Sequence, residues 1–175
     1  MPAADYESFS DPAHRAVVEA EKLAREHGHG LVGPEHLLVT VMAADPPVRA
    51  LLACRGVSPE EVARAYEQWA PRQAPVGRTA GFSPGLRRVV QLATRQARQE
   101  RSTQVTGLHL LHGIACSEDE VAWRLLATIG VDPDRLVTDP AAGSPGRTTG
   151  DEHGGRRGWR RSILGAARTV ASAAR

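Results

Sequence analysis

Apolar residues recur at spacings of three and four along most of the chain, a pattern that predicts helices packed on helices. Ser10 and Asp11 are suited to cap a first helix that has Pro12 near its first turn and stops at Gly28. Its predicted buried stripe consists of Ala13, Ala16, Val17, Ala20 and Ala24. The sequence therefore begins with an amphipathic helix.

Three shorter helices are predicted to follow. One begins near Pro34 and carries Leu37, Leu38, Val41 and Met42. The next begins at Pro46 and closes at Gly56, and the last begins with a capping-box-like pattern at Ser58. Each begins at a residue that favours a helix start, so the first part of the chain is expected to form four short helices.

The four-helix pattern occurs twice, at an offset of 73 residues. Residues 9–38 and 82–111 share 11 identities over 30 ungapped pairs, and one inserted residue in the second copy changes the later offset to 74. The second set of helices is predicted near 84–100, 107–116, 119–129 and 132–137. The last is short because Pro140 follows it.

The resulting prediction is an all-α fold in which two tandem four-helix repeats pack as one pseudo-twofold domain, because one copy alone would bury too little surface. The expected boundaries are an extension over 1–8, the double repeat over 9–137, with copies at 9–69 and 82–137, a flexible linker over 138–158 and a basic amphipathic segment over 159–175.

Charge is divided unevenly between these parts. Residues 1–140 have 15 basic and 18 acidic residues, a net of −3, whereas residues 141–175 have 7 Arg and 2 acids, a net of +5. The basic segment places Trp159, Ile163, Ala167, Val170 and Ala174 at helical spacing. Three outcomes stay open for it: docking on a protein partner or on its own domain, contact with an anionic membrane surface, or disorder. Nucleic-acid binding is not expected, because the basic residues cluster only here.

Targeting and cysteine content favour a cytoplasmic protein. The sequence shows no apolar stretch of spanning length and no secretory signal pattern at its start. Its two cysteines, Cys54 and Cys116, lie in apolar helix-like stretches, so a disulfide framework is not expected.

Two repeated motifs resemble the N-terminal domain of Clp-type AAA+ unfoldases, especially the ClpC and ClpA branches. The first copy has Phe9-Ser10 and Arg15 followed by Gly-Pro-Glu-His-Leu-Leu from Gly33, and the second has Phe82-Ser-Pro and Arg88 followed by His-Leu-Leu from His109. The resemblance covers about residues 9–137 and implies a module that receives adaptor proteins or tagged substrate peptides.

The resemblance also implies a set of ligand-binding residues. In ClpC-like members the glutamate of each Glu-His-Leu-Leu motif helps to hold phosphoarginine, and a carboxylate pairs well with a guanidinium. Glu35 matches that glutamate, whereas Leu108 replaces it in the second copy. At most one such site is therefore expected, with Glu35 for the cationic group and Phe9, Phe82 and Arg88 around it.

Two functions follow from the resemblance. The first is a non-enzymatic binding protein that recognises peptides, adaptors or phosphoarginine and modulates or competes with a Clp unfoldase. The alternative is self-protection by sequestering cyclic peptide antibiotics, which bind actinobacterial relatives near the phenylalanine matched by Phe82. An ATPase is not expected, because the sequence has no phosphate-binding Gly-rich loop and only one lysine, Lys22. No cofactor is expected.

Other chemistry has simpler explanations. A metal site could be drawn from His27, His29 and His36 or from His109, His112 and Cys116, yet His36 and His109 hold matched positions that suit packed, hydrogen-bonded side chains at helix starts. No metal is therefore predicted.

A nucleophilic Cys116 paired with His112 would need an exposed thiolate, and the sequence favours a small core residue instead. Acids at 118–120 suit a helix N-terminus. Phe9 and Phe82 either pack the start of each repeat against the core or line an exposed peptide-binding patch.

Overall fold

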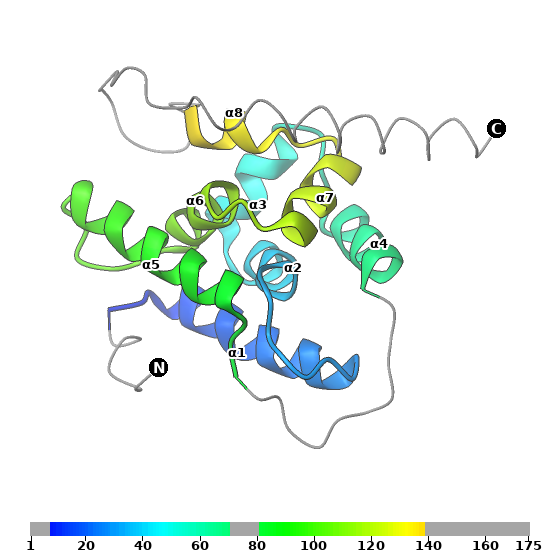
Figure 1. Cartoon of the computed structure of the whole chain (residues 1–175). Helices are drawn as coiled ribbons and strands as arrows, with labels where there is room; N and C mark the ends of the chain where they lie inside the picture. Colours follow the sequence, from blue (N-terminus) through cyan, green and yellow to red (C-terminus); the bar gives the residue numbers. More distant parts are fainter. Residues whose placement is uncertain (1–7, 71–80, 139–175) are drawn as a thin grey trace.

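The computed structural model describes residues 8–70 and 81–138. Within them the fold is all-helical, as predicted, with no strand beyond two isolated bridges (Figure 1). The first copy forms four helices: α1 (Asp11–Glu26), α2 (Pro34–Ala44), α3 (Pro46–Ala53) and α4 (Pro59–Trp69). The second forms α5 (Pro84–Gln99), α6 (Gly107–Cys116), α7 (Glu120–Thr128) and α8 (Pro133–Thr138). The predicted linker and basic segment lie outside the described residues, apart from Thr138.

Side-chain caps explain where several helices begin. The hydroxyls of Ser10, Ser58 and Ser83 accept hydrogen bonds from backbone N–H groups in the first turns of α1, α4 and α5. The carboxylates of Asp45 and Asp119 do the same for α3 and α7. These contacts satisfy donors that a helix start leaves without a partner.

The two copies are joined by reciprocal backbone pairing. Phe9 forms a parallel bridge with Val105, and Phe82 forms the matching bridge with Val32. Ser10 N–H donates to Val105 O at 3.0 Å, and Ser83 N–H donates to Val32 O at 2.9 Å. Because residues 82 and 105 lie 73 positions after residues 9 and 32, each copy supplies the start of its first helix to the other copy.

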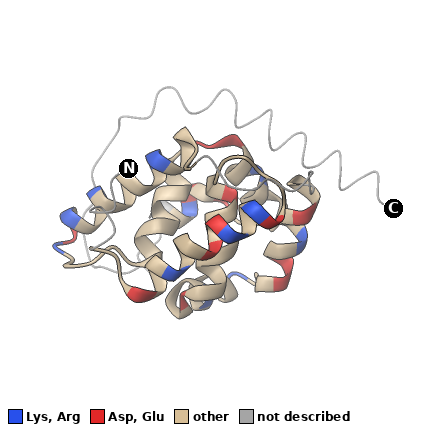
Figure 2. Ribbon diagram, turned by 90° about the horizontal axis from the view of Figure 1, so that it is seen from below, with Lys and Arg blue, Asp and Glu red and all other residues tan. Residues whose placement is uncertain are grey.

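The core is shared between the copies. The buried stripe of α1 consists of the five residues predicted from its spacing, and one apolar cluster contains side chains from all eight helices. The centre is formed by α2 and α6, which contact each other and helices of both copies. Glu35 is the only charged residue in α2, and α6 has none, while Figure 2 shows the other charged residues along the surrounding helices. The predicted single domain with a common interior is confirmed.

In the described residues, no single helix has the length and apolar composition of a membrane span, and α2 and α3, which pass that test only as a pair, are bent by 97°.

Candidate functional site

Glu35 lies in the first turn of α2 with its side chain 17% exposed. Its carboxylate folds back over Gly33, where even a Cβ atom would overlap it. Oε1 lies 2.9 Å from His36 Nδ1. That nitrogen, however, already accepts the Gly33 N–H at 2.9 Å. The imidazole therefore has no donor to offer at this nitrogen, and the carboxylate is suited to accept from a ligand.

His36 fixes the start of α2 from inside the core. Because Nδ1 accepts from Gly33, the ring proton is on Nε2, which donates to His29 Nδ1 at 2.8 Å. In the second copy, His109 Nδ1 accepts the Thr106 N–H at 2.9 Å. Both rings are buried, so the prediction of packed, hydrogen-bonded histidines at helix starts is confirmed. No three His, Cys, Asp or Glu side chains in residues 8–70 and 81–138 are grouped to hold a metal ion.

A second carboxylate, that of Asp119, lies beside Glu35. One of its oxygens, Oδ1, accepts from Val121 N–H at 3.2 Å and from Ala122 N–H at 3.1 Å. The other oxygen lies against Gly85 of α5, where a Cβ atom would overlap it. Burial raises the pKa of Asp119, and the negative charge of Glu35 raises it further, while the two backbone donors oppose the rise. The two carboxylates therefore repel each other in a partly dehydrated place.

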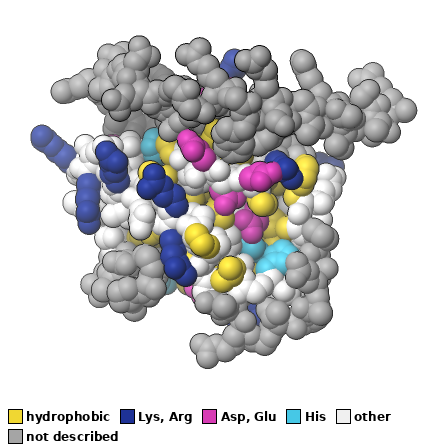
Figure 3. Space-filling view, viewed as in Figure 1, with side chains coloured by type: hydrophobic (Ala, Val, Ile, Leu, Met, Phe, Trp, Pro, Cys, Tyr) yellow, Lys and Arg dark blue, Asp and Glu magenta, His cyan; other side chains and the backbone are white. Residues whose placement is uncertain are grey.

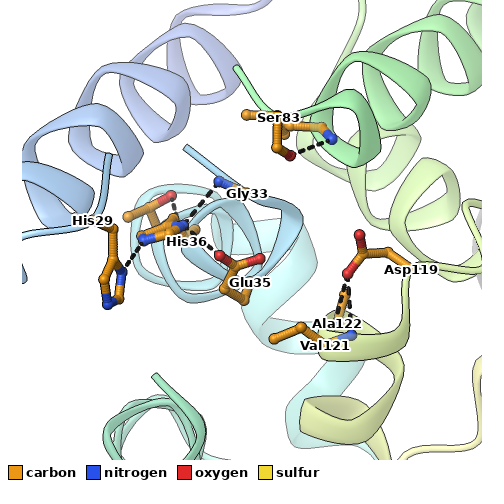
Figure 4. Close-up of polar contacts among 10 residues, drawn as sticks. His29, Gly33, Glu35, His36, Ser83, Asp119, Val121 and Ala122 are labelled. Carbon is orange, nitrogen blue, oxygen red and sulfur yellow. Dashed lines mark hydrogen bonds and ion pairs between the residues drawn. The ribbon is translucent and has the colours of Figure 1, made fainter. Parts of the chain in front are cut away.

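Three helix starts meet at this pair of acids, those of α2, α5 and α7 (Figure 4). Ser83, which caps α5, lies on the opposite side of the space between Glu35 and Asp119 in Figure 4. Its hydroxyl accepts from Leu86 N–H at 3.1 Å. In Figure 3 acidic side chains gather near the centre of this face with histidine beside them, and Lys and Arg side chains lie to the left. Helix N-termini attract anions, whereas the carboxylates attract cations. The arrangement suits a ligand in which a cationic group is joined to an anionic one.

The matching place in the second copy is closed. Asp45, which matches Asp119, is 3% exposed and accepts from Val48 N–H at 3.2 Å and from Gly107 N–H at 3.1 Å. Gly107 matches Pro34, which has no N–H to donate, so Asp119 cannot gain the equivalent bond. Leu108 takes the position of Glu35. The acidic site therefore exists in one half of the pseudo-twofold domain.

The predicted ligand-binding residues are divided between the two halves. Phe82 pairs with Val32, just before Glu35, and so belongs to the half with the two carboxylates. Phe9 pairs with Val105 and belongs to the Leu108 half. Both rings are buried, at 5% and 8% exposure, as the core-packing interpretation predicts. Ligand contact by either ring stays a prediction.

The guanidinium of Arg88 is exposed on α5, one helical turn beyond Gly85. Its role in ligand binding stays a prediction.

Asp119 was not among the sequence-predicted binding residues. The signal that could have found it is its match to Asp45, since both aspartates precede a short helix at the offset of 74 residues.

Cys116 and His112 form a contact at the end of α6, with Sγ 3.5 Å from Nε2. Burial lowers the pKa of His112, more than the nearby Glu100 raises it. A neutral imidazole can accept a hydrogen bond from the thiol but has no positive charge to stabilise a thiolate, and the C-terminal end of a helix disfavours negative charge. The pair therefore lacks the electropositive setting that an activated thiolate needs.

Comparison with known proteins agrees with the fold. The family model for the Clp repeat (R) N-terminal domain matches residues 8–129. A chloroplastic ATP-dependent Clp protease ATP-binding subunit, ClpA homolog CD4B of Solanum lycopersicum, is 28% identical over 146 residues, which cover 79% of this chain and 15% of that protein. The chain thus spans about one seventh of this relative's length.

Solved structures show the same architecture. The N-terminal domain of the chaperone ClpD from Arabidopsis thaliana superposes with a TM-score of 0.64 at 21% identity, covering 81% of this chain and 96% of that one. A ClpV N-domain in complex with a VipB peptide superposes with a TM-score of 0.60 at 21% identity, covering 76% of this chain and 84% of that one. With its matching repeats and all-helical fold, the chain belongs to the Clp repeat N-terminal domain family.

Proposed function

We propose that this domain recruits adaptor proteins or substrate peptides to a Clp unfoldase system by binding an arginine side chain, preferentially a phosphorylated one, between Glu35 and Asp119. The observation that carries the proposal is the pair of carboxylates at three converging helix starts, with a raised pKa at Asp119. A guanidinium would relieve the repulsion between the two acids and form bidentate hydrogen bonds with them.

In this proposal the phosphoryl group binds beside the guanidinium, near the start of α5. At the start of α5, Pro84 has no N–H and the Leu86 N–H already donates to Ser83 Oγ. The Gly85 N–H and the positive end of the helix dipole would attract an anion there. The site therefore offers opposite charges to the two ends of a phosphoarginine side chain. A peptide-bound relative of the same fold, the ClpV N-domain with its VipB peptide, supports a peptide as the carrier of that side chain.

The observed asymmetry predicts one binding site for each chain. Leu108 offers no carboxylate, and Asp45 uses its second oxygen to accept from Gly107. The antibiotic-sequestering alternative depends on Phe82, whose ring would have to leave the core to contact a ligand. The carboxylate pair is partly buried but accessible without such a change, which favours the peptide-recruiting function.

Calorimetric titration with a short peptide containing one phosphoarginine tests the proposal. The wild-type chain is expected to bind with a stoichiometry of one. Glu35→Gln should weaken binding by at least about tenfold, because a charge-assisted hydrogen bond is worth about 1.5–3 kcal/mol. The matched control is Glu60→Gln, which changes an exposed glutamate in the first turn of α4 and should leave the affinity unchanged.

Two results would overturn the proposal. One is binding that Glu35→Gln and Glu60→Gln weaken equally. The other is the absence of binding by a folded wild-type chain, with folding verified by its circular dichroism. Replacing phosphoarginine with arginine in the same peptide measures how much of the affinity depends on the phosphoryl group.

A further inference from the structure

A groove lies on a different part of the domain, between α3, α6 and the start of α8. Its volume is about 740 Å³. Apolar side chains line much of it, including Pro47, Ala50, Leu51, Cys54, Leu108 and Val131. Two arginines, Arg55 and Arg135, and one acid, Asp132, complete the lining, so its ionised side chains have a net charge of +1.

The repeat relates this groove to a covered surface elsewhere in the domain. In the first copy, the last turn of α4 covers α7: Trp69 Nε1–H donates to Thr128 Oγ1 at 2.8 Å, and Arg124 Cζ lies 5.6 Å from the centre of the indole ring. In the second copy, α8 has 6 residues where α4 has 11, and it packs mainly on α6 and α7. The position that matches Trp69 is Gly143, which lies outside the described residues.

Among the described residues, α8 does not cover α3 as the last turn of α4 covers α7. The positions on α3 that match Arg124 and Thr128 are Ala50 and Cys54. Both are exposed and both line the groove. Two small side chains of α3 therefore occupy the positions that, on α7, hold the indole ring of Trp69. The groove has the position, the apolar surface and the room for the aromatic end of a helix.

We propose that this groove docks an acidic amphipathic helix of a partner protein, with an aromatic side chain placed over Ala50 and Cys54. The helix that fills the equivalent place in the first copy shows the required chemistry, since α4 carries three glutamates, one arginine and a terminal Trp69. Arg55 and Arg135 favour such a helix by charge complementarity. The chain's own segment 159–175 contains Trp159 but is strongly basic, and its arginines would meet those of the groove.

This surface is separate from the Glu35 site and does not depend on the function proposed for it. None of its lining residues belongs to the pair of carboxylates or to the helix start at Ser83. A partner protein could therefore use both surfaces together, with an arginine side chain at one and a helix at the other. Two linked contacts would raise the overall affinity beyond that of either alone.

The test uses the full chain and a fluorescein-labelled peptide with the sequence of residues 58–70, SPEEVARAYEQWA, which has the acidic and aromatic character required. Fluorescence anisotropy is expected to rise to saturation as the chain is added. Ala50→Glu should weaken binding at least tenfold, because it places a negative charge where the indole would pack. Ala53→Glu, an exposed position on the same helix that does not line the groove, is the matched control and should change the affinity by less than twofold.

Further variants separate the possible causes. Arg135→Glu should weaken binding several-fold, whereas Arg98→Glu, on the exposed surface of α5, should not. Glu35→Gln should leave this binding unchanged, so a failure here is distinguishable from a failure of the arginine site. No saturable binding, or equal weakening by Ala50→Glu and Ala53→Glu, would overturn the proposal. Binding seen only when Trp159→Ala is introduced would also overturn it, since the chain's own segment would then occupy the groove.

Discussion

The two matched aspartates Asp45 and Asp119 are expected to differ sharply in their contribution to stability. Asp45→Ala removes the cap of α3, worth about 1 kcal/mol, and leaves the buried Gly107 N–H without its acceptor, which costs about 1–3 kcal/mol. The expected loss is about 2–4 kcal/mol. Asp119→Ala also removes a cap, but it removes a carboxyl whose ionised form is disfavoured by burial and by Glu35. The expected net loss is below about 1 kcal/mol.

Thermal unfolding followed by circular dichroism at pH 7 measures this difference. For a domain of this size, 1 kcal/mol corresponds to about 4 °C in Tm, so Asp45→Ala should lower Tm by about 8–16 °C and Asp119→Ala by less than about 4 °C. Asp11→Ala, which changes an exposed acid in the first turn of α1, is the control and should change stability by no more than about 0.5 kcal/mol. Equal losses for Asp45→Ala and Asp119→Ala would refute the asymmetry derived from Gly107.

Three further predictions concern acidity, reactivity and packing. Asp119→Asn keeps a cap but removes a carboxyl whose folded-state pKa is raised. Wild-type stability should fall as pH rises from about 4 through the raised pKa, so the Tm of the variant should increase relative to that of the wild type over that range. A difference in Tm that stays constant from pH 3 to pH 7 would contradict the burial of the Asp119 carboxyl. Iodoacetamide should label the exposed Cys54 well before Cys116 in the folded chain, as mass spectrometry of the digested protein can show, and faster labelling of Cys116 would reveal an activated thiolate. Phe82→Ala should lower the free energy of unfolding by about 3–5 kcal/mol in urea denaturation, and a loss below about 1 kcal/mol would mean that the ring is not a core residue.

Much of the fold could be predicted from local signals. Proline and capping residues mark where most helices begin, and Gly28 follows the end of α1 with a φ of 76°. Pro140, which cannot continue a helix, likewise predicts a short last helix, and the described residues of α8 run to Thr138. These signals act within a few residues of one another, so the sequence alone displays them.

The pairing between the copies could not be predicted in the same way. Self-similarity shows that residues 9 and 82 are equivalent, but it does not show that Phe9 pairs with Val105 and Phe82 with Val32. An arrangement in which each copy pairs within itself would have the same repeat. The exchange becomes evident only from the backbone hydrogen bonds that cross between the copies.

The candidate site was predicted in part for a related reason. Glu35 is identified from its motif, and Leu108 is identified as the residue that replaces the glutamate in the second copy. The role of Asp119 depends on the lack of a hydrogen bond, because Pro34 has no N–H to donate, and these two residues are 85 positions apart in the sequence. The groove was also not predicted, because the small residues that line it, such as Ala50 and Cys54, form no sequence motif.

The most direct test of the account is a map of the phosphoarginine site by ¹H–¹⁵N correlation spectra of the full chain. Chemical-shift changes on adding the phosphoarginine peptide are expected to concentrate at the first turns of α2, α5 and α7, around Glu35, Ser83 and Asp119. They should be absent around Leu108. Shift changes centred on Leu108 and α3, or equal changes in the two halves, would contradict it.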